Sequence, residues 1–215
     1  MAVSITVDAA AAGSGPAAGL APAVFIDKDG TLIHDLPYNV DPARVRLRED
    51  AGPALARLQQ AGYRLVLITN QAGLAHQKFE EEALQPVWDI LASLLGLYGV
   101  TLDAIYYCPH HPQGSHPEFG RGCDCRKPAP GLLLRAARKH QLDLARSWFI
   151  GDILDDIEAG HRAGCRTVLL DVGAETEWRN SPLRRPDRVA ASLTEAAADI
   201  LAAAALAGAT MEMAE

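Results

Sequence analysis

The feature that most constrains the fold is a regular alternation of short apolar runs with segments of helical pattern. The apolar runs lack polar alternation, which is typical of strands buried on both faces of a parallel sheet. Strands are expected at 24–26, 64–69, 104–107, 147–150 and 167–170, and helices at 52–61, 79–95, 130–140, 154–163 and 193–205. This order predicts the α/β class, with a mostly parallel, Rossmann-like sheet between two layers of helices.

Residues that favour helix ends occur at two of the predicted helices. Asp50 is a suitable N-cap for the first helix, Pro53 fits its first turn, and Gly62 follows its end. In the second helix, Glu80 to Glu82 form an acidic first turn that suits the helix dipole. Pro86 is expected to kink or locally reset that helix, since proline removes a backbone hydrogen bond.

Length and charge limit the number of domains and the kind of partner. The 215 residues suffice for one domain, which we place at 22–206, between a loose Ala/Gly-rich extension at 1–21 and a tail at 207–215. The net charge of -7 argues against nucleic acid or an anionic membrane as partner. Neither a signal peptide nor a membrane span is apparent, so a cytoplasmic protein is expected, with a monomer as the default state.

Polar side chains follow three of the predicted strands, where the carboxyl ends of parallel strands meet at one edge of a sheet. These side chains are Asp27 and Asp29 after the first strand, Thr69 and Asn70 after the second, and Asp152, Asp155 and Asp156 after the fourth. Lys127 adds a positive charge that can help to hold a phosphate. Carboxylate oxygens suit Mg²⁺, which often also contacts substrate phosphate. The pattern therefore predicts a magnesium and phosphate site at this edge.

A second group of metal-ligand residues lies in the segment 108–125. Its members are Cys108, His110, Cys123 and Cys125, and thiolates with an imidazole are the preferred ligands of Zn²⁺ in a closed tetrahedral site. Such a site has a structural role. His111 and His116 are alternatives to His110, and three free thiols are the alternative to a metal. Cys165 is interpreted as a buried thiol.

The motifs together resemble those of the haloacid dehalogenase-like phosphatases. They are Asp27-Lys28-Asp29-Gly30-Thr31, then Thr69-Asn70, then Lys127, and finally Gly151-Asp152 with Asp156, all in that order along the chain. The resemblance implies that Asp27 attacks phosphorus and that Asp29 acts as general acid and base. It also implies that Asp27, Asp152 and the backbone carbonyl of Asp29 hold Mg²⁺. Thr69 and Lys127 would bind the phosphoryl oxygens, and Asp156 would orient Lys127 or a water.

Within that superfamily, two stretches are similar to the D-glycero-D-manno-heptose 1,7-bisphosphate 7-phosphatases. These are Ile105-Tyr106-Tyr107-Cys108-Pro109-His110-His111-Pro112-Gln113-Gly114 and Cys123-Asp124-Cys125-Arg126-Lys127-Pro128. The resemblance runs from about Val24 to Leu170. It implies hydrolysis of a phosphorylated sugar, a role for Arg126 with Asn70 in binding the substrate, and a site without a large cap domain. Histidinol-phosphate phosphatases and other small sugar-phosphate phosphatases are alternatives.

The chain departs from the pattern of the heptose family at three places near the expected substrate. His76 and Gln77 stand where that family often has an Arg-Gly pair, Ile153 replaces a common Lys, and Lys28 replaces an Arg. Losing two cations should weaken the hold on a second phosphate, so the anomer or the sugar can differ. An alternative of another class is a zinc-braced binding module without catalysis, but such a module would not require both Asp27 and Asp29.

Overall fold

A computed structural model describes residues 4–5, 20–179 and 181–212. Within this part of the chain, seven strands form one sheet in the order β1-β4-β3-β2-β5-β6-β7. The strands are β1 (Ser4–Ile5), β2 (Ala23–Ile26), β3 (Arg64–Asn70), β4 (Ala104–Cys108), β5 (Trp148–Gly151), β6 (Arg166–Leu170) and β7 (Arg188–Ala190). In this order, the six strands that follow β1 all pair in parallel with one another. β1 pairs antiparallel with β4 at one edge of the sheet.

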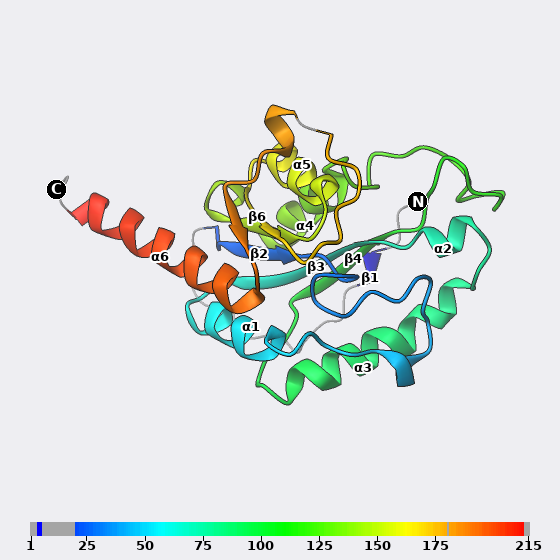
Figure 1. The fold of residues 1–215 in the computed structure, drawn as a ribbon, viewed down its shortest axis with the longest axis horizontal. Helices are drawn as coiled ribbons and strands as arrows, with labels where there is room; N and C mark the ends of the chain where they lie inside the picture. The colour runs from blue at the N-terminus through cyan, green and yellow to red at the C-terminus, as the bar shows by residue number, and fades with distance from the viewer. Residues whose placement is uncertain (1–3, 6–19, 180, 213–215) are drawn as a thin grey trace.

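Helices cover both faces of the sheet, as predicted for the α/β class (Figure 1). One face carries α1 (Ala51–Gln60), α3 (Leu84–Gly96) and α6 (Leu193–Glu212), and the other carries α4 (Gly131–His140) and α5 (Leu154–Ala163). The short helix α2 (Ala72–Ala75) directly follows β3. Four 3-10 turns complete the described elements: η1 (Pro42–Arg44), η2 (Glu81–Ala83), η3 (Leu144–Arg146) and η4 (Pro182–Arg184).

The central strands are buried on both faces because their side chains alternate between two cores. Val24 and Ile26 of β2 pack into the core under α1, α3 and α6. Phe25 of the same strand packs into the opposite core, with side chains of α4 and α5. Every residue of β2 is fully buried, which explains why this strand shows an unbroken apolar run instead of polar alternation.

All five predicted strands are present within a residue or two of the predicted positions, whereas β1, β7 and α2 were not predicted. β7 is short and two of its three residues are exposed, so it carries no apolar run. β1 lies inside the segment expected to be a loose extension; residues 1–3 and 6–19 of that segment are outside the described residues. Helix α6 runs to Glu212, so the prediction of its end near 205 was wrong, whereas the division of the chain into a domain at 22–206 and a tail from 207 stays a prediction.

The starts of two helices differ in detail from the predictions. Pro86 does not kink a helix that begins at residue 79, because α3 begins at Leu84 and the proline lies in its first turn, where no hydrogen-bond donor is lost. Asp50 precedes α1 but does not cap it. Its carboxylate instead accepts a hydrogen bond from the backbone of Thr194, at 2.7 Å, at the start of α6. Among the described helices, none combines the length and apolar character needed to span a bilayer.

Candidate active site

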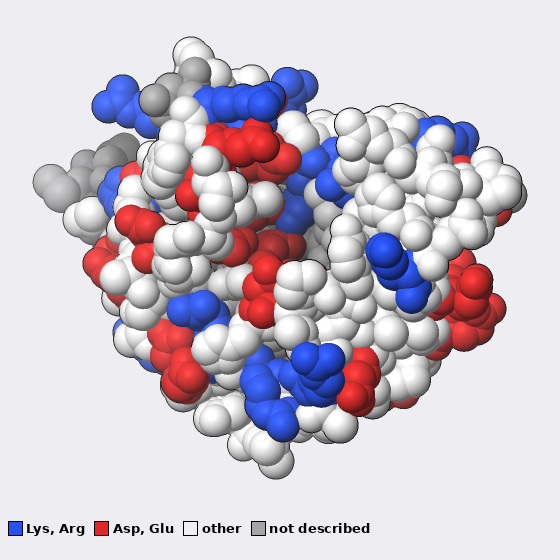
Figure 2. All heavy atoms as spheres, turned by 45° about the vertical axis from the view of Figure 1, so that its right-hand side comes forward, with Lys and Arg blue, Asp and Glu red and all other residues white. Residues whose placement is uncertain are grey.

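A cavity of about 260 Å³ opens at the carboxyl edge of the sheet, where the polar residues were predicted to converge. Its lining consists of Asp27, Asp29, Asp35, Thr69, Asn70, Arg126, Lys127, Asp152, Ile153 and Ala174. These residues come from the ends of β2, β3 and β5 and from three loops, which follow β2, β4 and β6. Figure 2 shows acidic and basic side chains gathered around a hollow in one face of the molecule. The predicted convergence is therefore present in the fold.

The turn after β2 is shaped by close contacts at Gly30. This glycine has a φ of +83°, and a Cβ atom there would lie 1.9 Å from a carboxylate oxygen of Asp152. Only glycine allows both the left-handed backbone and this approach. Thr31 then donates a hydrogen bond of 3.1 Å to Oδ1 of Asp152. The turn after β2 and the end of β5 are thus locked together, which brings Asp27 and Asp152 to one place.

Lys127 lies between two buried carboxylates on the floor of the site. Its ammonium forms ion pairs with Asp27 and, at 2.6 Å, with Asp156. Burial alone would lower the pKa of Lys127, but the carboxylates of Asp156 and Asp27 raise it above its usual range. The predicted role of Asp156 in orienting Lys127 agrees with this geometry. Lys127 itself lies in the turn before α4, not in the helix.

The acid cluster formed by Asp27, Asp152 and Asp156 fits a divalent cation. Each residue offers a carboxylate oxygen, and the three oxygens lie within 4.8 Å of one another. Burial raises the pKa of Asp27 and of Asp152 to about 7 despite the opposing effect of Lys127, and raises that of Asp156 to about 6. One ammonium therefore does not balance three carboxylates, and Mg²⁺ bound through oxygen ligands would supply the missing positive charge.

Asp29 lies at the wall of the cavity and is more exposed than Asp27. Its Oδ1 accepts a hydrogen bond of 2.7 Å from Lys28, and its Oδ2 accepts one of 3.2 Å from the side chain of Gln71. Asp35 lines the same wall. The pKa of Asp35 is raised, mainly by burial and to a smaller extent by the charge of Asp29. This wall therefore carries two carboxyl groups that face the space above Asp27.

Asn70 makes two hydrogen bonds to the backbone of Lys127. Its Oδ1 accepts from the Lys127 N–H at 3.1 Å, and its Nδ2 donates to the Lys127 carbonyl at 3.3 Å. The amide therefore fixes the segment that carries Lys127, although Asn70 also lines the cavity. Arg126 is half-buried at the rim, where its guanidinium reaches the carbonyl of His110 at 3.5 Å.

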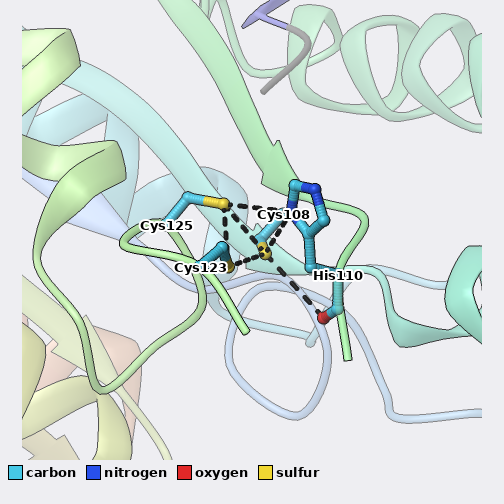
Figure 3. A group of neighbouring side chains, drawn as sticks. All are labelled: Cys108, His110, Cys123 and Cys125. Atoms are coloured by element: carbon cyan, nitrogen blue, oxygen red, sulfur yellow. Dashed lines mark hydrogen bonds between the residues drawn. The ribbon is translucent and has the colours of Figure 1, made fainter. Parts of the chain in front are cut away.

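Four side chains, one from the end of β4 and three from the loop between β4 and α4, point toward a common centre (Figure 3). These are Cys108, His110, Cys123 and Cys125, and their ligand atoms lie within 4.8 Å of one another. His111 and His116, the alternatives to His110, lie outside this group: His116 stacks on Phe119, and the ring of His111 contacts that of His76. The predicted ligand set is therefore the one that the fold brings together.

The spacing of this thiol cluster fits a tetrahedral metal better than a disulfide. The sulfur atoms lie 3.2 to 3.5 Å apart, and Nδ1 of His110 lies 3.4 and 3.7 Å from the sulfurs of Cys125 and Cys108. Ligands about 2.3 Å from a central Zn²⁺ would be separated by about 3.7 Å. Hydrogen bonds from Cys108, and then from Cys123 and His110, lower the pKa of Cys125 to about 5. A thiolate at this place suits zinc.

Of the residues that depart from the heptose-family pattern, only Ile153 lies in the wall of the cavity. His76 and Gln77 lie in the turn after α2 and belong to a neighbouring group. The ring of His76 contacts those of Tyr38 and His111, and Gln77 donates a hydrogen bond to Ser115. Lys28 is buried against Trp88, with its ammonium 5.9 Å from the ring centre.

Comparison with known proteins shows the family to which this chain is similar. A HAD-hydrolase-like family model matches residues 124–196. Over 149 residues the chain is 41% identical to the D-glycero-beta-D-manno-heptose-1,7-bisphosphate 7-phosphatase of Escherichia coli K12, covering 69% of this chain and 78% of the relative. The enzyme of that name from Haemophilus ducreyi is 44% identical, with 69% and 81% covered. The chain belongs to the HAD-like heptose-bisphosphate phosphatase family.

A solved structure of the same family agrees with the arrangement of the fold. The D,D-heptose 1,7-bisphosphate phosphatase of B. bronchiseptica, solved with magnesium and phosphate, superposes with a TM-score of 0.68 at 33% identity. The match covers 84% of this chain and 98% of the other. The predicted resemblance, fold class and phosphatase activity are therefore confirmed.

Sequence reasoning missed several residues of the cavity or its support. Thr31 belongs to the first motif but was given no role, and Gln71 directly follows Asn70, so the position of each residue could have indicated it. Asp35 lies in the Pro-containing loop after β2, and Ala174 lies in the loop after β6. Neither loop carries a pattern that predicts which of its residues face the site.

Proposed function

We propose that the protein is a magnesium-dependent phosphatase that removes the 7-phosphate of D-glycero-D-manno-heptose 1,7-bisphosphate. The observation that carries this proposal is the placement of Asp27 beside Lys127 on the floor of a cavity whose wall carries Asp29. A nucleophile, a cation for the phosphate and a second carboxyl group are thus within one small space. The names of the relatives support the choice of sugar.

In this proposal Asp27 attacks phosphorus and forms an aspartyl-phosphate, while the bond from phosphorus to the sugar oxygen breaks. Asp29 gives its proton to that leaving oxygen and later takes a proton from the water that hydrolyses the aspartyl-phosphate. Lys127 and the hydroxyl of Thr69 bind the phosphoryl oxygens and stabilise the charge that develops on them. Asp156 holds the ammonium of Lys127 in place, and Asn70 fixes its backbone.

The two metals have different roles. Asp27, Asp152 and the backbone carbonyl of Asp29 would hold Mg²⁺, which neutralises charge on the phosphate and on the clustered carboxylates. Cys108, His110, Cys123 and Cys125 would hold a structural Zn²⁺. That ion would fix the segment leading to Arg126, which lies at the rim of the cavity and suits the sugar or a second phosphate.

The test of this proposal is a substrate panel assayed by phosphate release with and without Mg²⁺. The panel contains the two anomers of the heptose bisphosphate, histidinol phosphate and simple sugar phosphates. We expect the highest kcat/KM for one of the heptose bisphosphates. Because Ile153 in the wall is neutral, the preferred anomer or sugar can differ from that of the relatives. If histidinol phosphate has the highest kcat/KM, the heptose assignment is rejected. The absence of any magnesium-dependent release would favour the binding module.

A further inference from the structure

Gln71 is a buried polar residue of the site that the proposed mechanism does not use. It directly follows β3, and its side chain is almost entirely buried. Its backbone N–H donates a hydrogen bond of 2.8 Å to the carbonyl of Cys108, at the end of the neighbouring strand β4. The residue is therefore fixed by its backbone at the point where β3, β4 and the cavity meet.

The side-chain amide of Gln71 connects two residues of the cavity. Its Nε2 donates to the hydroxyl of Thr69 at 2.9 Å and to Oδ2 of Asp29 at 3.2 Å. The amide oxygen can only accept hydrogen bonds, so in this arrangement the NH₂ group of Gln71 is the part that faces both oxygens. An NH₂ group has two hydrogens, which is the number that these two contacts require.

Each contact has a consequence for the reaction. A hydroxyl that accepts a hydrogen bond from Gln71 keeps its own proton for another acceptor, so Thr69 can donate to a phosphoryl oxygen in the cavity. Asp29 is held between Gln71 on one oxygen and Lys28 on the other. A general acid works only when its carboxyl group is within reach of the leaving oxygen, and these two donors limit its rotation.

We propose that Gln71 is a positioning residue for phosphoryl transfer, which orients Asp29 toward the leaving oxygen and makes Thr69 a donor to the phosphate. The inference rests on the proposed function of the same cavity and deepens it. Gln71 touches neither the phosphate nor the metal in this scheme. Its effect should therefore depend on how much a substrate needs protonation of its leaving group.

The test compares Gln71→Met with the wild type on two substrates. Methionine keeps the length of the side chain but has no N–H group. A sugar phosphate has an alkoxide leaving group that requires a proton, whereas p-nitrophenyl phosphate releases a stable phenolate without one. We expect kcat for the sugar phosphate to fall at least about tenfold more than kcat for p-nitrophenyl phosphate. The reason is that the substitution impairs general acid catalysis, which only the sugar phosphate requires. KM should change little.

Gln71→Glu provides a second variant if the methionine protein folds poorly. A glutamate retains the shape but repels Asp29, so we expect the same difference between the two substrates. Gln77→Met is the matched control, because Gln77 lies near Gln71 in sequence, is exposed and does not line the cavity. It should keep wild-type rates on both substrates. Circular dichroism checks that all the variants fold.

The outcomes separate this inference from the proposed function. If Gln71→Met loses activity equally on both substrates, or loses none, Gln71 does not position Asp29, although the phosphatase proposal remains intact. If the wild-type protein hydrolyses neither substrate in the presence of Mg²⁺, the proposed function and this inference are both wrong. A selective loss on the sugar phosphate, absent in Gln77→Met, supports the inference.

Discussion

The acid cluster and the thiol cluster are both groups of buried metal-ligand residues, but they differ in how their charge is balanced. In the acid cluster, Lys127 already forms ion pairs with Asp27 and Asp156. In the thiol cluster the sulfur atoms form hydrogen bonds mainly with one another and with His110. The acid cluster also faces an open cavity, whereas the thiol cluster has its four ligands directed inward.

If the two clusters hold Mg²⁺ and Zn²⁺ as proposed, this difference predicts which of the two metals the fold depends on. Buried carboxylates that have an ammonium among them can remain together without a metal, so the loss of Mg²⁺ should affect the reaction more than the fold. Thiols without a comparable cation gain their binding energy from the metal itself, and removal of zinc should therefore affect the fold. The following predictions test this contrast, in order of decreasing expected effect.

The substitution Asp27→Asn should have the largest effect. An amide cannot act as the nucleophile, so we expect phosphate release to fall by about a thousandfold or more. The melting temperature should stay close to that of the wild type, because asparagine is nearly isosteric with aspartate. Burial also raises the pKa of Asp27, so ionisation of this carboxyl group does not stabilise the folded protein. Turnover at a rate near that of the wild type would contradict the assignment of the nucleophile.

Cys125→Ser should remove zinc and destabilise the protein. Serine is a poor zinc ligand at neutral pH, and Cys125 is the sulfur whose pKa is lowered to about 5. We expect elemental analysis to change from one zinc per chain to nearly none, with a loss of stability of more than about 3 kcal/mol. A variant without zinc that melts at the wild-type temperature would show that the cluster does not brace the fold.

Lys127→Met should destabilise the protein by about 3 kcal/mol, because it leaves buried carboxylates without their partner. Addition of Mg²⁺ should raise the melting temperature of this variant more than that of the wild type, because the ion replaces part of the lost positive charge. The measurement is thermal unfolding with Mg²⁺ and with a chelator. Equal shifts in both proteins would mean that Lys127 does not balance the acid cluster.

Cys165→Ala should have the smallest effect and serves as the control for the thiol cluster. Burial raises the pKa of the Cys165 thiol to about 12, and this side chain lies apart from the other three sulfurs. We expect one zinc per chain to remain and stability to fall by about 1 kcal/mol through loss of packing. Loss of zinc in this variant would show that the ligand set has been assigned incorrectly.

The sequence predicted the acid cluster because its residues follow buried strands, and the ends of parallel strands share one edge. Asp27, Thr69 and Asp152 needed no more information than this. The ligands of the thiol cluster were predictable for another reason, since cysteine and histidine pairs carry their chemistry in local spacing. In both regions the residues that react or ligate are also the residues with the strongest sequence signals.

Residues that support the site were harder to predict, because their partners are distant in the sequence. Asp50 looks like a cap for the helix that follows it, but it caps a helix 144 residues further along the chain. Gln71 has the pattern of a polar strand end and gives no indication that it donates to Asp29. Such contacts depend on side-chain geometry in the folded state, which local propensity does not contain.

The double hydrogen bond from Asn70 to the backbone of Lys127 has a consequence for how this enzyme can change during evolution. With Cys125 two residues earlier directed into the thiol cluster, the backbone segment that carries Lys127 is held from both sides. The exposed positions within 111–122, unlike the closely packed Gly114 and Gly120, can therefore accept new side chains without moving Lys127. Substitutions can accumulate at these positions while the arrangement around Lys127 is inherited unchanged.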